Sequence, residues 1–292
     1  MPASRAAAPR LPGRAIWIDG RLQRGPQATL SLFDRGARDG EGLFETVRVE
    51  GGRCHFWSRH LERLVLSAAE LGFPVPPSPA RLAAGVQELL AEENLSDAVV
   101  RITVTRGIPG GRPTRTGCWI EAEPLTGRLW SGTRAGAARV VISRTAFEPG
   151  SIGRHKTTSR LAYHLAREEA RAAGADEALL ATAGGVLLEG AVSNVFVSVR
   201  GELLTPALSS GILPGIVRAV VLERCRQLGI AAHEAPLTIA DLEHADEVLL
   251  TNCVQEVVPL ASFGGRAFGA PKLAAKLLAE CRAAAEATAG GW

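Results

Sequence analysis

Long hydrophobic runs are missing from this sequence. No stretch of about 18 consecutive apolar residues occurs, although a membrane-spanning helix needs one. Residues 1–14, MPASRAAAPRLPGR, also lack the apolar segment of a secretory signal peptide. We therefore expect a cytoplasmic protein with no membrane partner.

Cysteines and histidines are too scattered along the chain to predict a disulfide framework or a metal site. The 5 cysteines are odd in number and lie far apart, which argues against a disulfide framework and for a reducing compartment. The 6 histidines show no metal-ligand spacing, so we predict no metal. The net charge of +3 is small and its basic residues are spread along the chain, which predicts no nucleic-acid surface.

Lysine is also scarce, because nearly all of the 33 basic residues are arginines. Lys272 and Lys276 lie four residues apart in a predicted terminal helix and are expected on its solvated face. Lys156 stands alone in SIGRHKTTSRLAYHL, at the entrance to a predicted helix. A lysine amine can form an imine with an aldehyde cofactor, whereas an arginine guanidinium cannot. Lys156 is therefore a candidate Schiff-base residue, although a solvated surface lysine is the plain alternative.

Periodicity predicts an α+β domain over residues 1–124. Alternating apolar residues and turn signals predict strands in IWIDGRL and around Gly51 and Gly52, and two more strands over 98–107 and 118–125. Two helices are predicted over 60–72 and 81–95. In the first helix the apolar residues recur at helical spacing: Leu61, Leu64, Val65, Ala68, Ala69 and Leu71.

A polar, glycine-containing segment over residues 125–136 predicts an interdomain connection. The larger second domain, 137–292, is expected to hold alternating strands and helices. The predicted strands are 138–144, 177–182, 186–190, 194–199 and 246–252, and the predicted helices are 158–173, 215–228 and one that carries Lys272.

Several motifs follow one another in a specific order. They are DRGARDGEGLFETVRV, FWSRHLERL, EALLATAGGVLLEGAVSNVFVSVRGELLTP and ALSSGILPGIVRAVVLERC. This series resembles the fold type IV, or class IV, pyridoxal-phosphate aminotransferases, near D-amino-acid transaminases and aminodeoxychorismate lyases. The resemblance extends from about Ile16 to about Pro259. It implies a two-domain α+β and α/β fold like that of D-amino-acid aminotransferase, pyridoxal 5′-phosphate as cofactor, and a homodimer.

The resemblance also implies cofactor-binding roles. Lys156 would form the Schiff base, and Glu189, at the end of a predicted apolar strand, would hold the ring nitrogen in its protonated form. A carboxylate facing water at the strand end is the alternative reading of Glu189. Arg63 would bind the phosphate, with Arg59 as the substitute one turn earlier. The other residues placed near the cofactor are Ser193, Asn194, Asn252, Cys253 and the helix start formed by Gly215, Ile216 and Val217, where free N–H groups favour an anion.

Substrate binding is assigned to three residues of the first domain. By resemblance, Arg112 in a loop and Arg38 would bind a substrate carboxylate, and Phe44 would line the pocket. The family's aromatic-Gly-Asp-Gly pattern is replaced here by Asp39-Gly40-Glu41-Gly42, so an acid stands where a pocket aromatic is usual.

Three activities are compatible with these features. The first is transamination between an amino acid, of D- or unusual specificity, and a 2-oxo acid. The second is the elimination of pyruvate from aminodeoxychorismate to give 4-aminobenzoate, which the Lys-x-x-Ser-Arg pattern from Lys156 favours. Branched-chain L-amino-acid transamination ranks lower, because Leu161 stands where those enzymes carry a tyrosine. A binding protein without catalysis is the remaining alternative.

Overall fold

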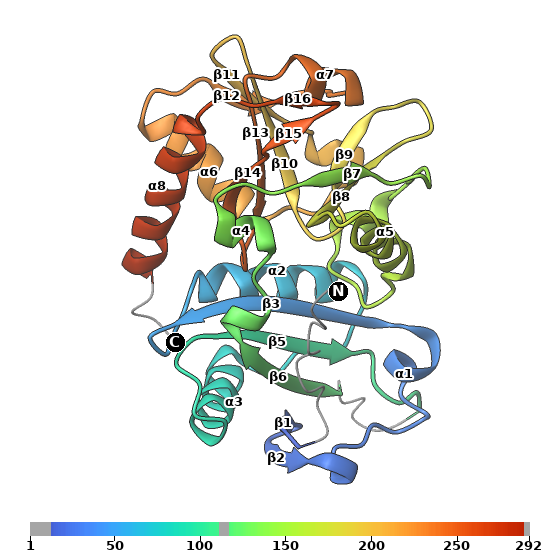
Figure 1. Cartoon of the computed structure of the whole chain (residues 1–292). Coiled ribbons are helices and arrows are strands. Elements are labelled where there is room, and N and C mark those ends of the chain that lie inside the picture. Colours follow the sequence, from blue (N-terminus) through green and yellow to red (C-terminus); the bar gives the residue numbers. More distant parts are fainter. Residues whose placement is uncertain (1–12, 111–116, 289–292) are drawn as a thin grey trace, which may run out of the picture. The chain divides into compact units, whose positions relative to one another are not determined.

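The computed structural model describes residues 13–110 and 117–288. The chain divides into two compact units, one ending at Arg128 and the other beginning at Leu129 (Figure 1). This division falls inside the segment 125–136, which forms a 3-10 turn, η2 (Leu125–Gly127), and a short helix, α4 (Ser131–Ala135). No helix of the described residues has both the length and the apolar character needed to cross a membrane.

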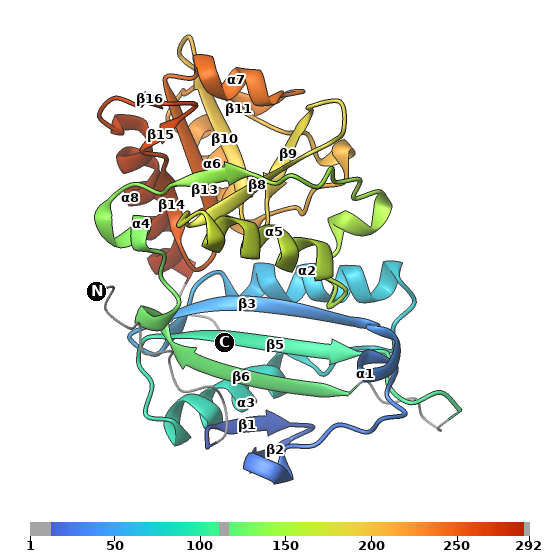
Figure 2. The ribbon, with the colours of Figure 1, turned by 45° about the vertical axis from the view of Figure 1, so that its right-hand side comes forward.

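The first unit is built on an antiparallel sheet of 6 strands in the order β2-β1-β6-β5-β3-β4 (Figure 2). The strands are β1 (Ala15–Ile18), β2 (Arg21–Arg24), β3 (Gly42–Glu50), β4 (Arg53–Cys54), β5 (Ala98–Thr105) and β6 (Cys118–Pro124). The central ladder pairs Gly42 with Thr105 and continues to Val49 with Ala98. Side chains alternate between the two faces of such a ladder, so this register places one row of β3 residues in the core.

Two helices, α2 (Trp57–Glu70) and α3 (Pro79–Glu92), share one hydrophobic core with this sheet. Ser78 caps α3 by accepting from the N–H of Arg81, and Pro79 occupies its first turn. Gly85 lets the helix approach the sheet closely, because a Cβ there would lie 2.7 Å from the Trp17 ring. The periodicity in α2 was partly wrong: Val65 is 45% exposed because it lies beside the buried stripe of the helix and not within it.

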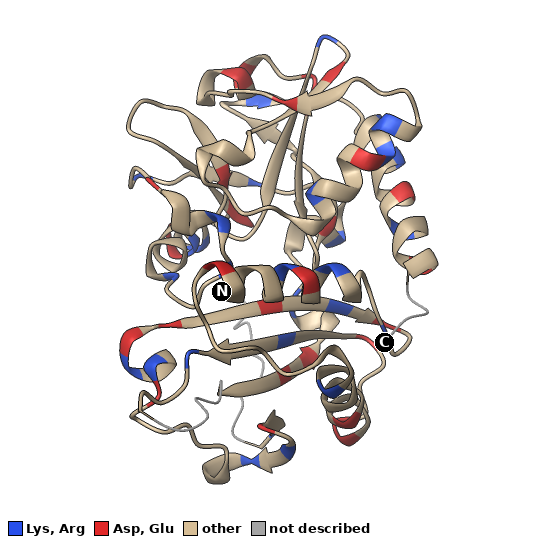
Figure 3. Ribbon diagram, turned by 180° about the vertical axis from the view of Figure 1, so that it is seen from behind, with Lys and Arg blue, Asp and Glu red and all other residues tan. Residues whose placement is uncertain are grey.

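Charges on the surface of this unit are mixed. Figure 3 shows acidic and basic segments alternating along α2.

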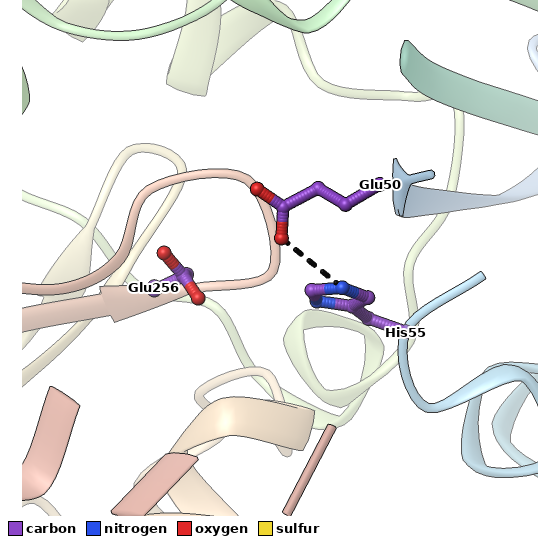
Figure 4. A group of neighbouring side chains, drawn as sticks. All are labelled: Glu50, His55 and Glu256. Carbon is purple, nitrogen blue, oxygen red and sulfur yellow. Dashed lines mark ion pairs between the residues drawn. The ribbon is translucent and has the colours of Figure 1, made fainter. Parts of the chain in front are cut away.

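At the β3–β4 hairpin, Glu50 Oε1 accepts from Arg48 at 2.6 Å, and its Oε2 lies 3.2 Å from His55 Nε2 (Figure 4). These contacts supply a carboxylate to Arg48, which is only 5% exposed and would otherwise be costly to bury.

The second unit contains a sheet of 5 strands, in the order β12-β11-β10-β13-β14, and a sheet of 3 strands, β7-β8-β9. The strands are β7 (Val140–Ile142), β8 (Glu177–Ala181), β9 (Leu187–Gly190), β10 (Asn194–Val199), β11 (Glu202–Thr205), β12 (Ala232–Glu234), β13 (Glu247–Asn252) and β14 (Glu256–Pro259), with a separate hairpin of β15 (Ser262–Phe263) and β16 (Arg266–Ala267). One apolar cluster joins residues of both sheets, among them Leu179, Leu187 and Val195. This shared core brings the ends of β9, β10 and β13 together.

Four α-helices that follow α4 belong to the second unit: α5 (Leu161–Ala172), α6 (Ile216–Gln227), α7 (Ile239–His244) and α8 (Lys272–Thr288). Helix α5 begins at Leu161 and not at Thr158 as predicted, because Arg160 has a non-helical backbone and acts as the N-cap. Lys156 therefore lies in a loop. Lys272 and Lys276 are exposed on α8, as predicted from their spacing. All 5 cysteines lie within the described residues, and no disulfide joins them.

Candidate active site

Lys156 lies in the loop between the 3-10 turn η3 (Ser151–Arg154) and α5. Glycines hold this loop in place. A Cβ on Gly153 would overlap the carbonyl oxygen of Gly211, and a Cβ on Gly211 would overlap that of Gly150. This close approach of two backbone segments positions the loop from which the half-buried Lys156 side chain extends.

Glu189 lies at the end of the apolar strand β9, as the sequence predicts, and is 3% exposed. Its Oε2 accepts hydrogen bonds from the N–H of Leu213 at 3.1 Å and from Asn194 Nδ2 at 3.3 Å. Its Oε1 accepts a longer one from the Tyr163 hydroxyl at 3.4 Å. The carboxyl group is thus oriented by three different elements of the second unit, and a surface role facing water is excluded by its burial.

The electrostatic environment of Glu189 leaves its charge incompletely compensated. Burial raises the pKa of this carboxyl to about 7, against the opposing effects of the Arg160 charge, the Leu213 N–H, the Lys156 charge and the Tyr163 hydroxyl. Because the Lys156 charge lowers the pKa of Glu189, the predicted imine-forming residue and the predicted acid act on one another. A cationic ring nitrogen beside Glu189 would supply the missing positive charge, so the site fits the predicted cofactor.

Asn194 connects Glu189 to the start of α6. Its Nδ2 donates to Glu189 Oε2 and also, at 3.0 Å, to the carbonyl oxygen of Leu213. A Cβ on Gly215 would overlap Asn194 Oδ1, so any other residue at 215 would displace the carboxamide. Glycine at this position is therefore required by the side chain that faces it.

The start of α6 has the features of an anion site. Gly215 is the N-cap and provides no side-chain cap, so the first N–H groups of this 12-residue helix are available to a ligand. Beside it, Thr251 lies opposite Asn194 in the β10–β13 ladder. The Thr251 hydroxyl is buried, and among the described residues it has no hydrogen-bond partner. A phosphate group would satisfy both features. The buried Ile216 and Val217 contribute backbone but no polar side chain.

The turn between β13 and β14 is held by Asn252. Its Oδ1 accepts from the N–H groups of Val254 at 2.8 Å and Gln255 at 2.7 Å. The carboxamide oxygen thus shapes the turn that begins at the half-buried Cys253. Direct contacts of Asn252 and Cys253 with the cofactor stay a prediction.

Ser193 supports a second buried acid, Glu177 on β8. Its hydroxyl donates to Glu177 Oε2 at 2.8 Å, and the same carboxylate accepts from the N–H groups of Val192 and Ala178, both at 3.0 Å. Burial raises the pKa of Glu177 despite these donors. Sequence reasoning missed Glu177, and the predicted contact of Ser193 with the cofactor stays a prediction.

Arg160 and Tyr163 were also missed as parts of this site. The Arg160 Cζ lies 3.5 Å from the centre of the Tyr163 ring, and Arg160 Nη2 donates to the carbonyl oxygen of Ala191 at 3.2 Å. Tyr163, the chain's single tyrosine, is 7% exposed, whereas Leu161 is 72% exposed. The chain's single tyrosine, three residues after Arg160, was the available signal.

In the first unit, Arg63 lies on α2 and is held by Glu45 of β3. Arg63 Nε donates to Glu45 Oε1 at 2.8 Å and its Nη2 to Oε2 at 2.6 Å, while His60 Nδ1 lies 2.7 Å from Oε2. Burial alone would raise the pKa of Glu45, but the charge of Arg63 and the hydrogen bonds from His60 and Arg63 lower it to about 2. The guanidinium predicted to bind the phosphate is thus firmly oriented, by two residues that sequence reasoning missed. Arg59 is half-buried on the same helix.

The predicted substrate residues differ in how far the structure describes them. Arg38 is exposed on the short helix α1 (Arg35–Asp39). Phe44 is 6% exposed, and the guanidinium of Arg101 lies over its ring with 3.7 Å between Cζ and the ring centre. Arg112 lies outside the described residues. Both Phe44 and Arg101 belong to the first unit, and Arg101 was not singled out from the sequence.

The Asp39-Gly40-Glu41-Gly42 pattern is held by arginines. Asp39, which stands where a pocket aromatic is usual, has its Oδ2 3.4 Å from Arg35 Nε. Glu41 Oε2 lies 2.7 Å from Arg106 Nε, and Glu41 Oε1 is paired with Arg35. Arg106 also donates to the carbonyl oxygens of Leu71 and Gly72 at 2.9 Å. Glu41 therefore fastens α1 to the end of β5 and has a structural contact that the sequence pattern did not reveal.

Comparisons with known proteins agree with this geometry. The sequence model of the family described as "Amino-transferase class IV" matches residues 42–263. A "Putative branched-chain-amino-acid aminotransferase" of Methanocaldococcus jannaschii is 34% identical over 259 residues, which cover 86% of this chain and 88% of the relative. A D-alanine aminotransferase of Listeria innocua is 31% identical over 260 residues, with the same shares of 86% and 88%. The solved branched-chain aminotransferase of Thermoproteus uzoniensis, with norvaline, superposes with a TM-score of 0.81 at 28% identity, over 92% of this chain and 93% of that one.

Proposed function

The chain belongs to the class IV aminotransferases, enzymes that use pyridoxal 5′-phosphate, and from this premise we propose that Lys156 carries the amino transfer between an amino acid and a 2-oxo acid. The observation that supports this most directly is the buried Glu189, with a raised pKa of about 7 and Lys156 among the groups that act on it. When bound, the cofactor supplies an electron sink for the negative charge left on the substrate carbon. The Lys156 amine would act as the base and the acid that moves a proton between the substrate carbon and the cofactor.

The remaining roles follow from charge and hydrogen bonding. Glu189 would accept a hydrogen bond from a protonated ring nitrogen, and Asn194 holds its carboxylate in place. In the second unit, the N–H groups at Gly215–Val217 and the Thr251 hydroxyl would bind the phosphate. Arg63 of the first unit keeps its predicted role as a phosphate-binding arginine. Ser193, Asn252 and Cys253 complete the surroundings of the cofactor through the strands and turn that they support.

The proposed donor is an uncharged aliphatic amino acid. The named substrates of two relatives, branched-chain amino acids and D-alanine, are both of this class. The D-preference expected from the sequence depends on Arg112 and Arg38, which would bind the substrate carboxylate beside Phe44. Branched-chain activity gains support from Tyr163. Leu161 stands where branched-chain enzymes carry a tyrosine, but a buried tyrosine, Tyr163, lies two residues later.

The lyase alternative loses one of its sequence arguments. The Lys-x-x-Ser-Arg pattern favoured a lyase, but Arg160 stacks on Tyr163 and bonds to Ala191 within the second unit. The presence of this arginine is thus explained without an aminodeoxychorismate substrate.

A substrate survey tests the proposed function. The purified protein loaded with cofactor is mixed with the D- and L-forms of alanine, valine and leucine, each with pyruvate or 2-oxoglutarate, and separately with aminodeoxychorismate. We expect transfer of the amino group with at least one aliphatic pair and no 4-aminobenzoate. Formation of 4-aminobenzoate without any transamination would overturn the proposal.

We also propose a cytoplasmic homodimer, in which the first unit contributes to a neighbouring site. Its support is a group of exposed apolar side chains in the first unit, where Leu32 is 83%, Phe33 69% and Ile108 44% exposed. Apolar groups of this kind commonly mark interfaces. A fully active monomer in solution scattering at the assay concentration would contradict the dimer.

A further inference from the structure

Two buried carboxylates lie on neighbouring strands of the second unit. Glu177 on β8 is 0% exposed and Glu189 on β9 is 3% exposed, and the two strands pair with one another. Ionised carboxylates in such an environment are costly unless cations lie nearby. The residues that supply this charge therefore influence how Glu189 can act.

Several groups from different elements face Glu189. The neutral ones are the Tyr163 hydroxyl from α5, the Asn194 carboxamide from β10 and the Leu213 N–H. The charged ones are Arg160, at the N-cap of α5, and Lys156. Of the two cations Arg160 has the larger effect on the pKa of Glu189, and it also acts on Glu177.

Arg160 is fixed in place by two contacts. Its guanidinium lies flat enough over the Tyr163 ring to bring Cζ within 3.5 Å of the ring centre, and its Nη2 donates to Ala191 O at 3.2 Å. Ala191 comes two residues after Glu189, so this hydrogen bond keeps the guanidinium at the strand end that carries the acid. The Tyr163 hydroxyl reaches Glu189 Oε1 from the same helix. Arg160 and Tyr163 thus hold one another in place beside Glu189.

Arg160 differs from Lys156 in a way that matters for the reaction. An arginine stays protonated throughout the accessible pH range, whereas a lysine amine that forms imines and moves protons changes its charge state. Only Arg160 can therefore provide a constant positive charge to Glu189 during turnover.

We propose that Arg160, stacked on Tyr163, is a positioning residue that keeps Glu189 ionised and thereby sets the protonation of the cofactor's ring nitrogen. The proposal rests on the function proposed above, since it needs Glu189 to be the partner of that nitrogen. It predicts that loss of the Arg160 charge raises the pKa of Glu189. The carboxyl then takes up its proton at higher pH and no longer offers a negative charge to the ring nitrogen, which loses its own proton at lower pH.

Two spectroscopic titrations test this. In the protein without cofactor, the ¹³C shift of the Glu189 carboxyl, assigned with Glu189→Gln, reports its pKa directly. In the loaded protein, the ¹⁵N shift of isotope-labelled pyridoxal phosphate reports the protonation of the ring nitrogen. Both are measured for the parent, for Arg160→Gln, which keeps a donor for Ala191 O but has no charge, and for Arg160→Lys, which keeps the charge. Arg171→Met, an exposed arginine on the same helix, is the matched control.

We expect Arg160→Gln to raise the pKa of Glu189 by about one unit or more, the usual effect of removing a close opposite charge. The ring nitrogen should deprotonate at correspondingly lower pH. Arg160→Lys should stay close to the parent, and Arg171→Met should not differ from it. If Arg160→Gln fails to fold, Arg160→Met replaces it, because methionine keeps the contact with the Tyr163 ring and has no charge. The difference in the Glu189 pKa between Arg160→Lys and the parent then also tests whether the charge at position 160 matters.

Unchanged titrations in Arg160→Gln would overturn the proposal, since a purely structural arginine would leave both signals in place. The two levels of inference fail separately. A parent protein that takes up no cofactor would defeat the proposed function, while the ¹³C titration would still decide whether Arg160 controls the charge of Glu189.

Discussion

Glu45 in the first unit and Glu189 in the second are both buried glutamates, 0% and 3% exposed, yet their pKa values move in opposite directions. Both carboxyls lose solvation on burial, which raises the pKa. Around Glu45 the Arg63 charge and His60 more than compensate, and the pKa is lowered to about 2. Around Glu189 the compensation is incomplete, and the pKa is raised to about 7. Equal burial therefore does not give equal chemistry.

The difference separates a structural acid from a reactive one. Glu45 accepts two hydrogen bonds from one guanidinium, so its charge is satisfied before any ligand arrives. Glu189 accepts from neutral donors at 3.1 to 3.4 Å and leaves room for a further cation. A carboxyl held in this condition is suited to a ligand that brings its own positive charge, as a protonated ring nitrogen does.

The largest expected effect concerns whether the reactive acid lies beside the attachment point of the cofactor. Lys156→Ala should abolish both turnover and the near-visible absorbance of the bound cofactor, because an alanine cannot form an imine. Absorbance and activity of the purified variant check this. Lys272→Ala, on the exposed face of α8, is the control and should behave like the parent. Normal activity in Lys156→Ala would remove the basis of the comparison.

Removing the structural acid should cost stability and not only function. Glu45→Gln leaves the Arg63 guanidinium largely buried without its anion, which is expected to cost about 3 to 5 kcal/mol of unfolding free energy. Denaturant unfolding of the cofactor-free protein at pH 8 measures it. Glu189→Gln at the same pH should instead be neutral or stabilising. Equal losses in the two variants would mean that the two acids do not differ.

The pH dependence of stability sharpens the same contrast. The pKa of Glu189 is raised from 4.5 to about 7, so the folded state holds this proton more tightly and the parent loses stability as pH rises between those values. Relative to the parent, cofactor-free Glu189→Gln should gain up to about 3 kcal/mol from pH 4.5 to above 7, with no change below that range. Glu45 acts oppositely, since its lowered pKa gives stability that is lost as pH falls from 4.5 to about 2. A flat difference between Glu189→Gln and parent would refute the raised value.

A smaller effect is expected on cofactor affinity when Arg63, the arginine held by Glu45, is removed. Arg63→Ala removes a charge-assisted contact with the phosphate, worth about 1.5 to 3 kcal/mol, so cofactor affinity should fall roughly ten- to a hundredfold. Equilibrium titration with cofactor measures the loss, and excess cofactor should restore activity. Arg59→Ala, one turn earlier on α2, is the matched control. If Arg59→Ala loses the affinity and Arg63→Ala keeps it, the phosphate role passes to Arg59.

The smallest effect is expected from adding a hydrogen-bond donor at the start of α6 in the second unit. Val217→Thr places a hydroxyl at the start of α6, where the side chain is 3% exposed, and should tighten cofactor binding by about 1 kcal/mol, roughly fivefold. Without cofactor the same hydroxyl is buried and should lower stability slightly. A variant whose affinity falls while its fold is intact would show that no phosphate lies near Val217.

Several elements could be predicted from the sequence because their signals are local. The hairpin at Gly51 and Gly52, helix α3 and the apolar strand that ends in Glu189 follow from periodicity and turn chemistry within a few residues. The chain's bias toward arginine was enough to single out Lys156. The ordered series of motifs identified the family before any contact was known.

Only the tertiary structure decided which partner each polar side chain takes. Arg63 is paired with Glu45, 18 residues earlier, and Ser193 donates to Glu177. Helix α5 begins three residues later than its periodicity suggests, because Arg160 turns toward Tyr163 and Ala191. Such pairings join strands and helices that are distant along the chain, so neither spacing nor propensity contains them. The physical reason is that a buried charge is stabilised by whatever the packed core brings within hydrogen-bond reach, and this depends on the whole fold.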